Sequence, residues 1–293
     1  MSFDKPTLFT GAATALITPF LGGAVDYEAL GNMIDAQIED GINAILVAGT
    51  TGEGSTLSLA ECAEVTRFAR VRIEGRVPLL AGCGSNCTAH AVELAHALSQ
   101  AGADALLAVT PYYNKTTDIG ILAHYRAIAD AAECPIVLYN VPSRTGFSMT
   151  IEHYRALAAH ENIVAVKEAS GDLGLLSALC DELGDQLDVY TGNDHQAVAS
   201  MRLGAQGVIS VISNVLPREM AELCRLCLAN DFSSASARQR AMLGQMRVLF
   251  EEVNPVPVKY VAALKGLCAA EYRLPLCPPS PALARKLQRM FCG

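Results

Sequence analysis

The strongest structural signal in the chain is the stretch Asn162-Ile163-Val164-Ala165-Val166-Lys167-Glu168-Ala169-Ser170-Gly171. Its apolar run, bounded by polar residues, is typical of a strand that is covered on both faces, as strands of parallel sheets are. Lys167 closes this strand, and the carboxyl ends of the strands carry the chemistry in an α/β barrel. Two interpretations of Lys167 are open at this point. Its ammonium can lose its proton at a desolvated rim and become a nucleophile, or it can extend its charge into solvent from the strand edge.

Outward from this strand, short apolar runs alternate with amphipathic stretches along most of the chain. The pattern predicts strands at 12–18, 44–48, 78–81, 105–109, 136–141, 163–167, 188–191 and 207–212. Helices are predicted after them at 26–40, 59–73, 88–100, 118–131, 151–159, 173–183, 195–203 and 218–229. Gly41, Gly102 and Gly204 each follow a predicted helix, where a left-handed C-cap favours glycine. Eight βα units predict a (β/α)₈ TIM barrel rather than an open doubly wound sheet.

The last sixty or so residues exceed what the barrel needs. Helices are predicted at 234–251, 258–267 and 281–290, and Asn254-Pro255-Val256-Pro257 separates the first two. We therefore expect a catalytic barrel over residues 1–230 and a C-terminal helical extension over residues 231–293. These three additional helices could pack on the side of the barrel or form an oligomer contact.

The composition restricts the class of partner. With 51% hydrophobic and 18% charged residues, the chain is typical of a soluble protein with a large core. The net charge of −8 argues against nucleic acid or an anionic membrane as a partner, so we expect a small-molecule partner. No apolar run approaches membrane-spanning length, and the N-terminus lacks the layout of a signal peptide. We expect a cytoplasmic location.

The ten cysteines fall mostly in apolar or helical stretches, where a free thiol in a reducing compartment behaves as a small hydrophobe. Cys224 and Cys227 form a C-x-x-C pair, but they lie in a stretch of helical periodicity without a second cysteine pair or a nearby histidine pair. Core thiols are favoured over a metal or redox site there.

Polar residues follow several predicted strands in a pattern that suits an acidic substrate. After the second strand, Gly49-Thr50-Thr51-Gly52-Glu53 combines glycines, which admit a ligand close to the backbone, with hydroxyls and N–H groups that suit a small carboxylate. This loop has neither the lysine of a Walker motif nor the spacing of a dinucleotide fingerprint. A glycine-rich turn without any ligand remains the alternative.

Tyr113 follows the fourth strand, and Tyr139 and Arg144 follow or close the fifth. Phenols at strand ends can pass protons, and a guanidinium can hold a carboxylate in a bidentate fork. Each tyrosine taken singly can equally be a half-buried packing residue. The combination with Lys167 and Thr51 at one face of the predicted barrel favours a catalytic site.

Six segments together resemble the dihydrodipicolinate synthase family, in chain order and with the family's spacing. They are Gly49–Glu53, Thr110–Asn114, Tyr139–Gly146, Val166–Ala169, Gly207–Val211 and Asn254–Lys259. The wider group of pyruvate-dependent class I aldolases, which includes N-acetylneuraminate lyase, shares the lysine and the Thr-Thr loop. Within that group, Ser143-Arg144-Thr145 favours the synthase, which acts in the diaminopimelate route to lysine.

The resemblance implies a role for each catalytic residue. Lys167 would form a Schiff base with pyruvate, and the iminium would act as an electron sink for an enamine. Tyr139 would be the acid/base residue nearest the imine, linked through Thr51 to Tyr113 as a proton relay. Tyr113 would serve a neighbouring subunit across a dimer interface. The chain would then be a homo-oligomer, at least a dimer and by expectation a tetramer formed as a dimer of dimers.

The resemblance also implies how the substrates are held. Thr50 and Thr51 would hold the carboxylate of pyruvate, and Arg144 that of the second substrate, L-aspartate 4-semialdehyde. Gly192 and Ile209, at the ends of the seventh and eighth strands, would line the pocket with their backbones. We expect no cofactor and no catalytic metal, since the six histidines fall mostly on predicted helices rather than at strand ends.

Two other functions are compatible with parts of this pattern. A sibling aldolase or lyase acting on a sugar acid would use the same lysine and Thr-Thr loop. A barrel used only for binding or scaffolding would keep the fold, although it would not need the lysine, the tyrosines and Arg144 together.

Departures from the family pattern bear on regulation. In many bacterial and plant members, lysine inhibits by binding at the dimer interface, through a serine and one or more histidines after the Thr-Thr-Gly-Glu loop and a glutamate after the asparagine of the third loop. Here Leu59 and Cys62 occupy positions in that loop where a histidine is expected, and His90 stands in place of the glutamate. We therefore expect weak or absent inhibition by lysine.

Overall fold

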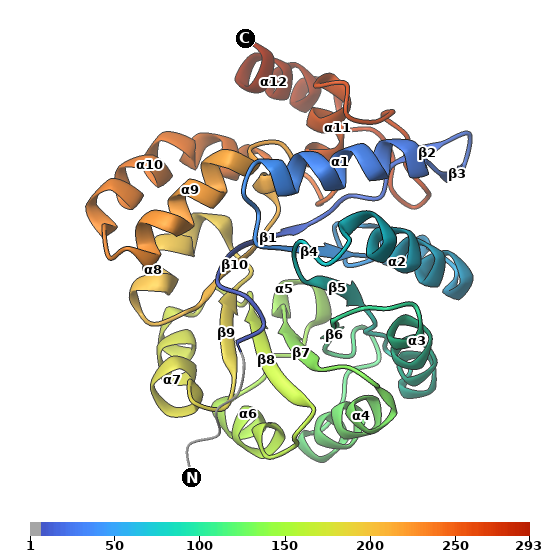
Figure 1. Ribbon diagram of the computed structural model, residues 1–293, viewed down its shortest axis with the longest axis vertical. Coiled ribbons are helices and arrows are strands. Elements are labelled where there is room, and N and C mark those ends of the chain that lie inside the picture. The colour runs from blue at the N-terminus through green and yellow to red at the C-terminus, as the bar shows by residue number, and fades with distance from the viewer. Residues whose placement is uncertain (1–6) are drawn as a thin grey trace.

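The predicted strands close into a parallel barrel (Figure 1). The structure is a computed structural model that describes residues 7–293, so the N-terminal residues 1–6, on which the expectation about a signal peptide rests, lie outside the described residues. In chain order the barrel strands are β1 (Gly11–Ala15), β4 (Ala44–Val47), β5 (Leu79–Gly82), β6 (Ala105–Val109), β7 (Ile136–Asn140), β8 (Ile163–Glu168), β9 (Asp188–Thr191) and β10 (Gly207–Ser210). Each strand pairs with its neighbours in parallel, and β1 closes the ring by pairing with both β4 and β10.

Helices surround the barrel as the alternating pattern predicts. They are α1 (Tyr27–Glu39), α2 (Leu59–Ile73), α3 (Thr88–Gln100), α4 (Asp118–Ala131), α6 (Ile151–Ala158), α7 (Leu173–Leu183), α8 (Ala197–Arg202) and α9 (Pro217–Leu228). Gly41, Gly102 and Gly204 have φ angles of 89°, 95° and 108°, so the predicted left-handed helix ends are confirmed. The (β/α)₈ barrel predicted from the sequence is therefore confirmed.

Short elements between the strands were not predicted. Strand β1 ends at Ala15, and the chain then forms a hairpin from β2 (Phe20–Leu21) and β3 (Ala24–Val25). Gly22 and Gly23 make its turn with positive φ angles. The other additions are the one-turn helix α5 (Pro142–Thr145) and the 3₁₀ turns η1 (Gly54–Thr56), η2 (Asp194–Gln196) and η3 (Ile212–Asn214). All of these lie after the carboxyl end of a barrel strand, where they shape the candidate site.

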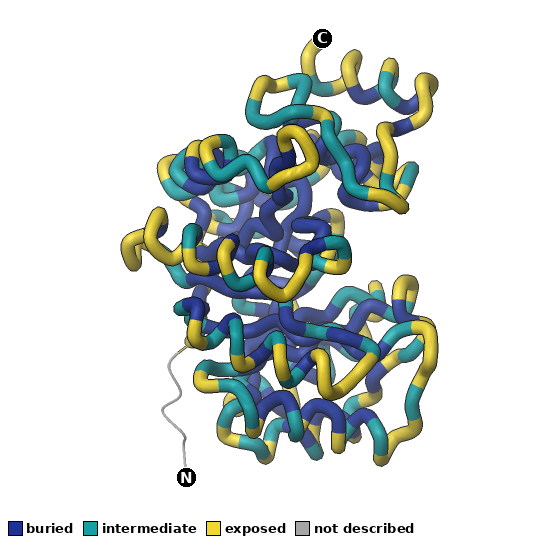
Figure 2. The backbone as a smooth tube through the Cα atoms, turned by 90° about the vertical axis from the view of Figure 1, so that its right-hand side faces the viewer, coloured by how far each residue is buried: buried dark blue, intermediate teal, exposed yellow. Residues whose placement is uncertain are grey.

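The core has two layers, which explains why the strands are apolar on both faces. Inside the ring, small side chains such as Ala13, Ala44, Ala105 and Ala165 leave room for larger ones, among them Tyr190. Between ring and helices lies a larger cluster of aliphatic side chains. Figure 2 shows the buried chain at the centre of the molecule and the exposed segments around its outside. Each fully buried large apolar side chain stabilises the fold by about 1.5–3 kcal/mol.

Three further helices follow the barrel, as predicted: α10 (Phe232–Val248), α11 (Val256–Leu264) and α12 (Pro281–Cys292). Helix α10 packs against α8 and α9, α11 packs against η3, and α12 packs against α11 and α10. In Figure 1, α12 lies at the edge of the molecule, away from the barrel. The division of the chain at residue 230 stays a proposal. No helix within residues 7–293 is both long and apolar enough to cross a membrane.

Candidate active site

The sheet register places Lys167 between two tyrosines inside the barrel. Lys167 on β8 is level with Tyr139 on β7 and with Tyr190 on β9. Residues level with one another in a parallel sheet point to the same face. The Lys167 Nζ atom lies 4.4 Å from the centroid of the Tyr139 ring. The predicted nucleophile and the predicted acid/base residue are therefore neighbours.

Burial changes the chemistry of Lys167. Its side chain is only 5% exposed, so the structure favours the nucleophile over a lysine that extends into solvent. Burial lowers the pKa of its ammonium to about 8, an effect opposed by the Asp194 carboxylate and reinforced by the Arg144 guanidinium. An amine with this pKa is unprotonated in a useful fraction of molecules near neutral pH.

Asp194 belongs to this site, although the sequence analysis did not single it out. It is 2% exposed, and its Oδ2 accepts N–H bonds from Val211 (3.1 Å) and Ile212 (2.8 Å). Within residues 7–293, its Oδ1 has no hydrogen-bond partner. Burial raises the pKa of the carboxyl group, and the N–H bonds oppose that rise. Its position directly after β9, at the face that carries the other candidates, is the signal that could have identified it.

Tyr139 is almost fully buried and lies beside the Thr-Thr loop. Burial raises the pKa of its phenol, while the charge of Arg144 and a side-chain hydrogen bond with Thr50 act in the opposite direction. The sequence analysis expected Thr51 in this place. In the structure the hydroxyl that hydrogen-bonds with the phenol is that of Thr50, and the Thr51 hydroxyl accepts a bond from Asn254 Nδ2 at 3.0 Å.

Glycines allow the close approaches that this site requires. A Cβ atom on Gly192 would lie 2.9 Å from Lys167 Cε, so glycine leaves the space that the lysine side chain occupies. A Cβ on Gly54 would lie 2.0 Å from the Ala48 carbonyl oxygen, so the loop after β4 could not fold back on itself with a larger residue. The predicted position of Gly192 beside the nucleophile is consistent with a pocket wall. Ile209 is fully buried in the cluster inside the barrel.

A cavity of about 570 Å³ opens next to Tyr139, and Lys167, Gly192 and Ile209 are not among its lining residues. Thr50, Tyr139 and Arg144 line it at the mouth of the barrel. It continues between α2 and α3, where its lining includes Leu59, Cys62, His90, Glu93 and Leu94. The guanidinium of Arg144 lies at this opening and donates from Nη2 to the Asn254 carbonyl oxygen at 3.0 Å. The site therefore offers one buried amine, two hydroxyls and a guanidinium, which suits a small acid with a reactive carbonyl.

The single chain does not bring Tyr113 to the other candidates. Its side chain is 91% exposed, and its φ angle of 71° is unusual for a residue other than glycine. Such a conformation costs roughly 1–3 kcal/mol and persists where the surroundings impose it. The neighbouring Tyr112 lines the cavity instead.

The cysteine pair on α9 lies in the core. Cys224 and Cys227 are buried, and burial raises the pKa of both thiols, that of Cys227 to about 11. These thiols pack as small apolar groups. Within residues 7–293, no three histidine, cysteine or acidic side chains are grouped so that they could hold a metal ion.

Comparisons with known proteins agree with this geometry. The model of the dihydrodipicolinate synthetase family matches residues 8–291. The 4-hydroxy-tetrahydrodipicolinate synthase of Pelobacter propionicus is 48% identical to this chain over 271 residues, which are 92% of this chain and 93% of that protein.

Solved structures show the same agreement. The crystal structure of dihydrodipicolinate synthase from Aquifex aeolicus superposes with a TM-score of 0.94 at 43% identity, over 96% of this chain and 97% of that one. The enzyme from Acinetobacter baumannii, described as complexed with pyruvate, has a TM-score of 0.94 at 41% identity, over 97% of both chains. Because sequence and structure match over nearly the whole length, the chain belongs to the dihydrodipicolinate synthetase family.

Proposed function

We propose that this protein condenses pyruvate with L-aspartate 4-semialdehyde through a Schiff base on Lys167. This is the reaction of 4-hydroxy-tetrahydrodipicolinate synthases, lyases of the class I aldolase type, in the diaminopimelate route to lysine. The observation that carries the proposal is the buried amine of Lys167, with its pKa lowered to about 8, 4.4 Å from the Tyr139 ring. Membership of the dihydrodipicolinate synthetase family supports this reaction over those of other pyruvate-dependent aldolases.

Imine formation uses the groups at the base of the site. The unprotonated Lys167 amine attacks the keto carbon of pyruvate, and the carbonyl oxygen leaves as water after it has gained protons. Tyr139, whose ring centroid lies 4.4 Å from Nζ, delivers a proton to that oxygen. The iminium then draws electrons from the adjacent C–H bond, so the methyl group loses a proton and an enamine forms.

The enamine carbon then attacks the aldehyde carbon of the second substrate and forms the new C–C bond, while the C=O π bond opens and its oxygen takes up a proton to become a hydroxyl. The amino group of the semialdehyde subsequently displaces Lys167 from the imine carbon, which closes the ring and frees the enzyme. Arg144 at the cavity mouth holds the carboxylate of the semialdehyde. The hydroxyl and N–H groups of Thr50 and Thr51 hold that of pyruvate, and Gly192 and Ile209 form the wall beside them.

The proton relay continues from Tyr139 to a threonine hydroxyl and on to Tyr113. The side-chain hydrogen bond between Thr50 and the Tyr139 phenol supports Thr50 rather than Thr51 as the middle member. Tyr113 then belongs to the relay of a second copy of the chain, which accounts for its exposed side chain. We accordingly propose a homo-oligomer, at least a dimer and in full a tetramer, located in the cytoplasm.

The experiment is a product assay with pyruvate and a series of aldehydes. L-Aspartate 4-semialdehyde should give turnover, and Arg144→Ala should raise its KM by about tenfold or more, the expected loss for a bidentate charged contact. The same variant should still form an imine with pyruvate. Turnover with a sugar aldehyde but not with the semialdehyde would instead support the sibling aldolase, and an absence of any imine would support a non-catalytic barrel.

A further inference from the structure

One residue of the C-terminal segment contacts both anion-holding loops of the barrel. Asn254 lies just before α11 and is 6% exposed. Its Nδ2 donates to Thr51 Oγ1 at 3.0 Å, and its main-chain carbonyl accepts from Arg144 Nη2 at 3.0 Å. Thr51 follows β4 and Arg144 follows β7, so Asn254 connects two parts of the site that are distant in the barrel sequence.

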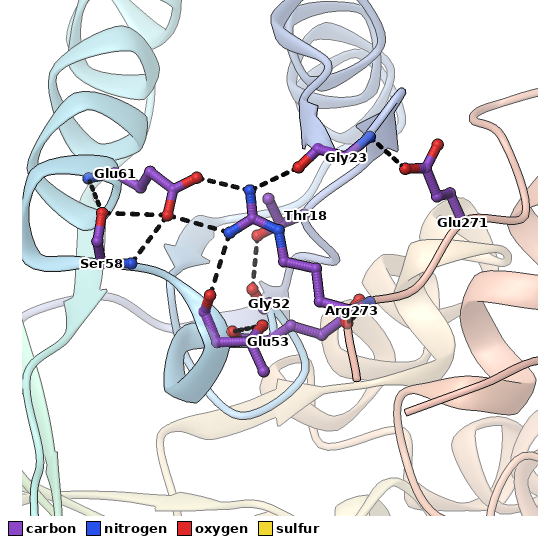
Figure 3. A network of polar contacts seen from close by, with 9 residues as sticks. Thr18, Gly23, Gly52, Glu53, Ser58, Glu61, Glu271 and Arg273 are labelled. Carbon is purple, nitrogen blue, oxygen red and sulfur yellow. Dashed lines mark hydrogen bonds and ion pairs between the residues drawn. The ribbon is translucent and has the colours of Figure 1, made fainter. Parts of the chain in front are cut away.

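The surroundings of Asn254 hold it in place. The Lys259 amide donates to the Pro255 carbonyl at 2.9 Å, and its buried Nζ lies 2.6 Å from Glu53 Oε1, two residues beyond Thr51. Arg273 joins the same loop from further along the chain. As Figure 3 shows, its guanidinium reaches Glu61 and the carbonyl of Gly23 on the hairpin. The C-terminal segment therefore contacts the loop at Thr51 itself and at Glu53, two residues after it.

The hydrogen bond from Asn254 to Thr51 limits the direction in which the Thr51 hydroxyl can donate its own hydrogen. A threonine hydroxyl has one O–H donor and can accept further bonds. When Oγ1 accepts from the Asn254 amide, its own hydrogen is free to donate. A carboxylate can only accept, so a hydroxyl oriented in this way is suited to bind one. Among the described residues, the Asn254 Oδ1 atom has no partner although it is buried.

We propose that Asn254 is a positioning residue of the active site, which orients the Thr51 hydroxyl toward the pyruvate carboxylate and anchors the Arg144 guanidinium at the cavity mouth. The proposal rests on the proposed function, because it assigns a role within that reaction. Asn254 acts through Thr51 and Arg144 and takes no part in bond formation. The extension then contributes to substrate binding as well as to the stability of the fold.

The test is a double-mutant cycle that pairs Asn254→Ala or Asn254→Asp with Thr51→Val. Borohydride trapping with pyruvate alone gives the pyruvate concentration at half-maximal labelling of Lys167. Each Asn254 variant should raise this concentration by about tenfold or more, as expected for a lost hydrogen bond that orients a group bound to a charged one. The maximal labelling at saturating pyruvate should stay the same. In the Thr51→Val background the Asn254 effect should largely vanish, because the atom it acts on is gone.

The matched control is Asn162→Asp, which removes two side-chain bonds to the Ala129 and Ala132 carbonyls at the opposite end of β8. This variant should leave the pyruvate concentration at half-maximal labelling unchanged. Two Asn254 variants are used so that a folding defect in one, detected by circular dichroism, does not end the test. Equal effects of the Asn254 variants in the wild-type and Thr51→Val backgrounds would overturn the proposal. Failure of the wild-type protein to label at all would instead refute the proposed function.

Discussion

Lys259 and Glu53 form a buried ion pair that tests how the C-terminal segment supports the Thr51 loop. Neither side chain has exposed surface, and Nζ and Oε1 are 2.6 Å apart. The ammonium also lies 4.0 Å from the centroid of the Phe20 ring. Lys259→Met keeps a similar volume but leaves the Glu53 carboxylate buried without its cation. Its remaining described contact is the long one of 3.5 Å to the Arg273 N–H.

Removal of one partner from such a pair costs about 3–5 kcal/mol, because the other charge remains desolvated. Since ~1 kcal/mol shifts Tm by roughly 2–4 °C in a domain of 150–250 residues, we expect a fall in Tm of roughly 6–20 °C. Equilibrium denaturation of Lys259→Met, Glu53→Gln and the double variant measures the free energy of unfolding directly. The double variant should lose less than the sum of the single losses, since neither charge is then left alone.

Lys265→Met is the matched control, because this lysine is exposed at the end of the same helix. It should change the free energy of unfolding by no more than about 0.5 kcal/mol. We expect both Lys259→Met and Lys265→Met to retain an imine on Lys167, provided that they are assayed below their melting temperatures. If the free energy of unfolding of Lys259→Met is within about 1 kcal/mol of the wild-type value, the buried pair does not support the loop as we argue.

Three further predictions concern the site itself. Because only the unprotonated amine attacks, the rate of imine formation at fixed pyruvate should rise with pH and level off above about pH 8; a rate that still rises about tenfold per pH unit above pH 9 would contradict the lowered pKa of Lys167. Gly192→Ala should abolish labelling of Lys167, since the added Cβ would lie 2.7 Å from Ala169 Cβ and 2.9 Å from Lys167 Cε; wild-type labelling would show that these neighbours can move aside. L-Lysine should inhibit turnover weakly or not at all, because Leu59, Cys62 and His90 offer its ammonium no carboxylate. Strong inhibition at sub-millimolar lysine would show otherwise, and its loss in Glu93→Gln would identify Glu93, in the same cavity, as the replacement partner.

The barrel could be predicted from the sequence because its signals are local. Apolar runs such as Ile163–Val166 are buried on both faces, and the glycines at helix ends take the left-handed conformation that their positions require. The hairpin after β1 was missed because its strands are two residues each, too short for any period to show. Its turn at Gly22-Gly23 was the available signal.

The site was predictable only in part, for a physical reason. Lys167, Tyr139 and Arg144 lie at or after the ends of strands, and these ends meet at one face of the barrel. They could therefore be identified as candidate site residues from their positions after the predicted strands. Which of two adjacent threonines bonds Tyr139 depends on the backbone of the loop, where Ala48 turns through a positive φ of 51°. Asn254 is separated from Thr51 by 203 residues, and no periodicity in the sequence reports such a contact.

The central claim is that one buried lysine forms a covalent imine with a keto acid. Borohydride added with pyruvate, followed by mass spectrometry of the digested protein, measures it most directly. The account predicts a single reduced adduct, with the mass of pyruvate less that of water plus two hydrogens, on the peptide that contains Lys167 and its absence in Lys167→Ala. An unmodified Lys167 under saturating pyruvate, or an equal adduct in Lys167→Ala, would contradict it.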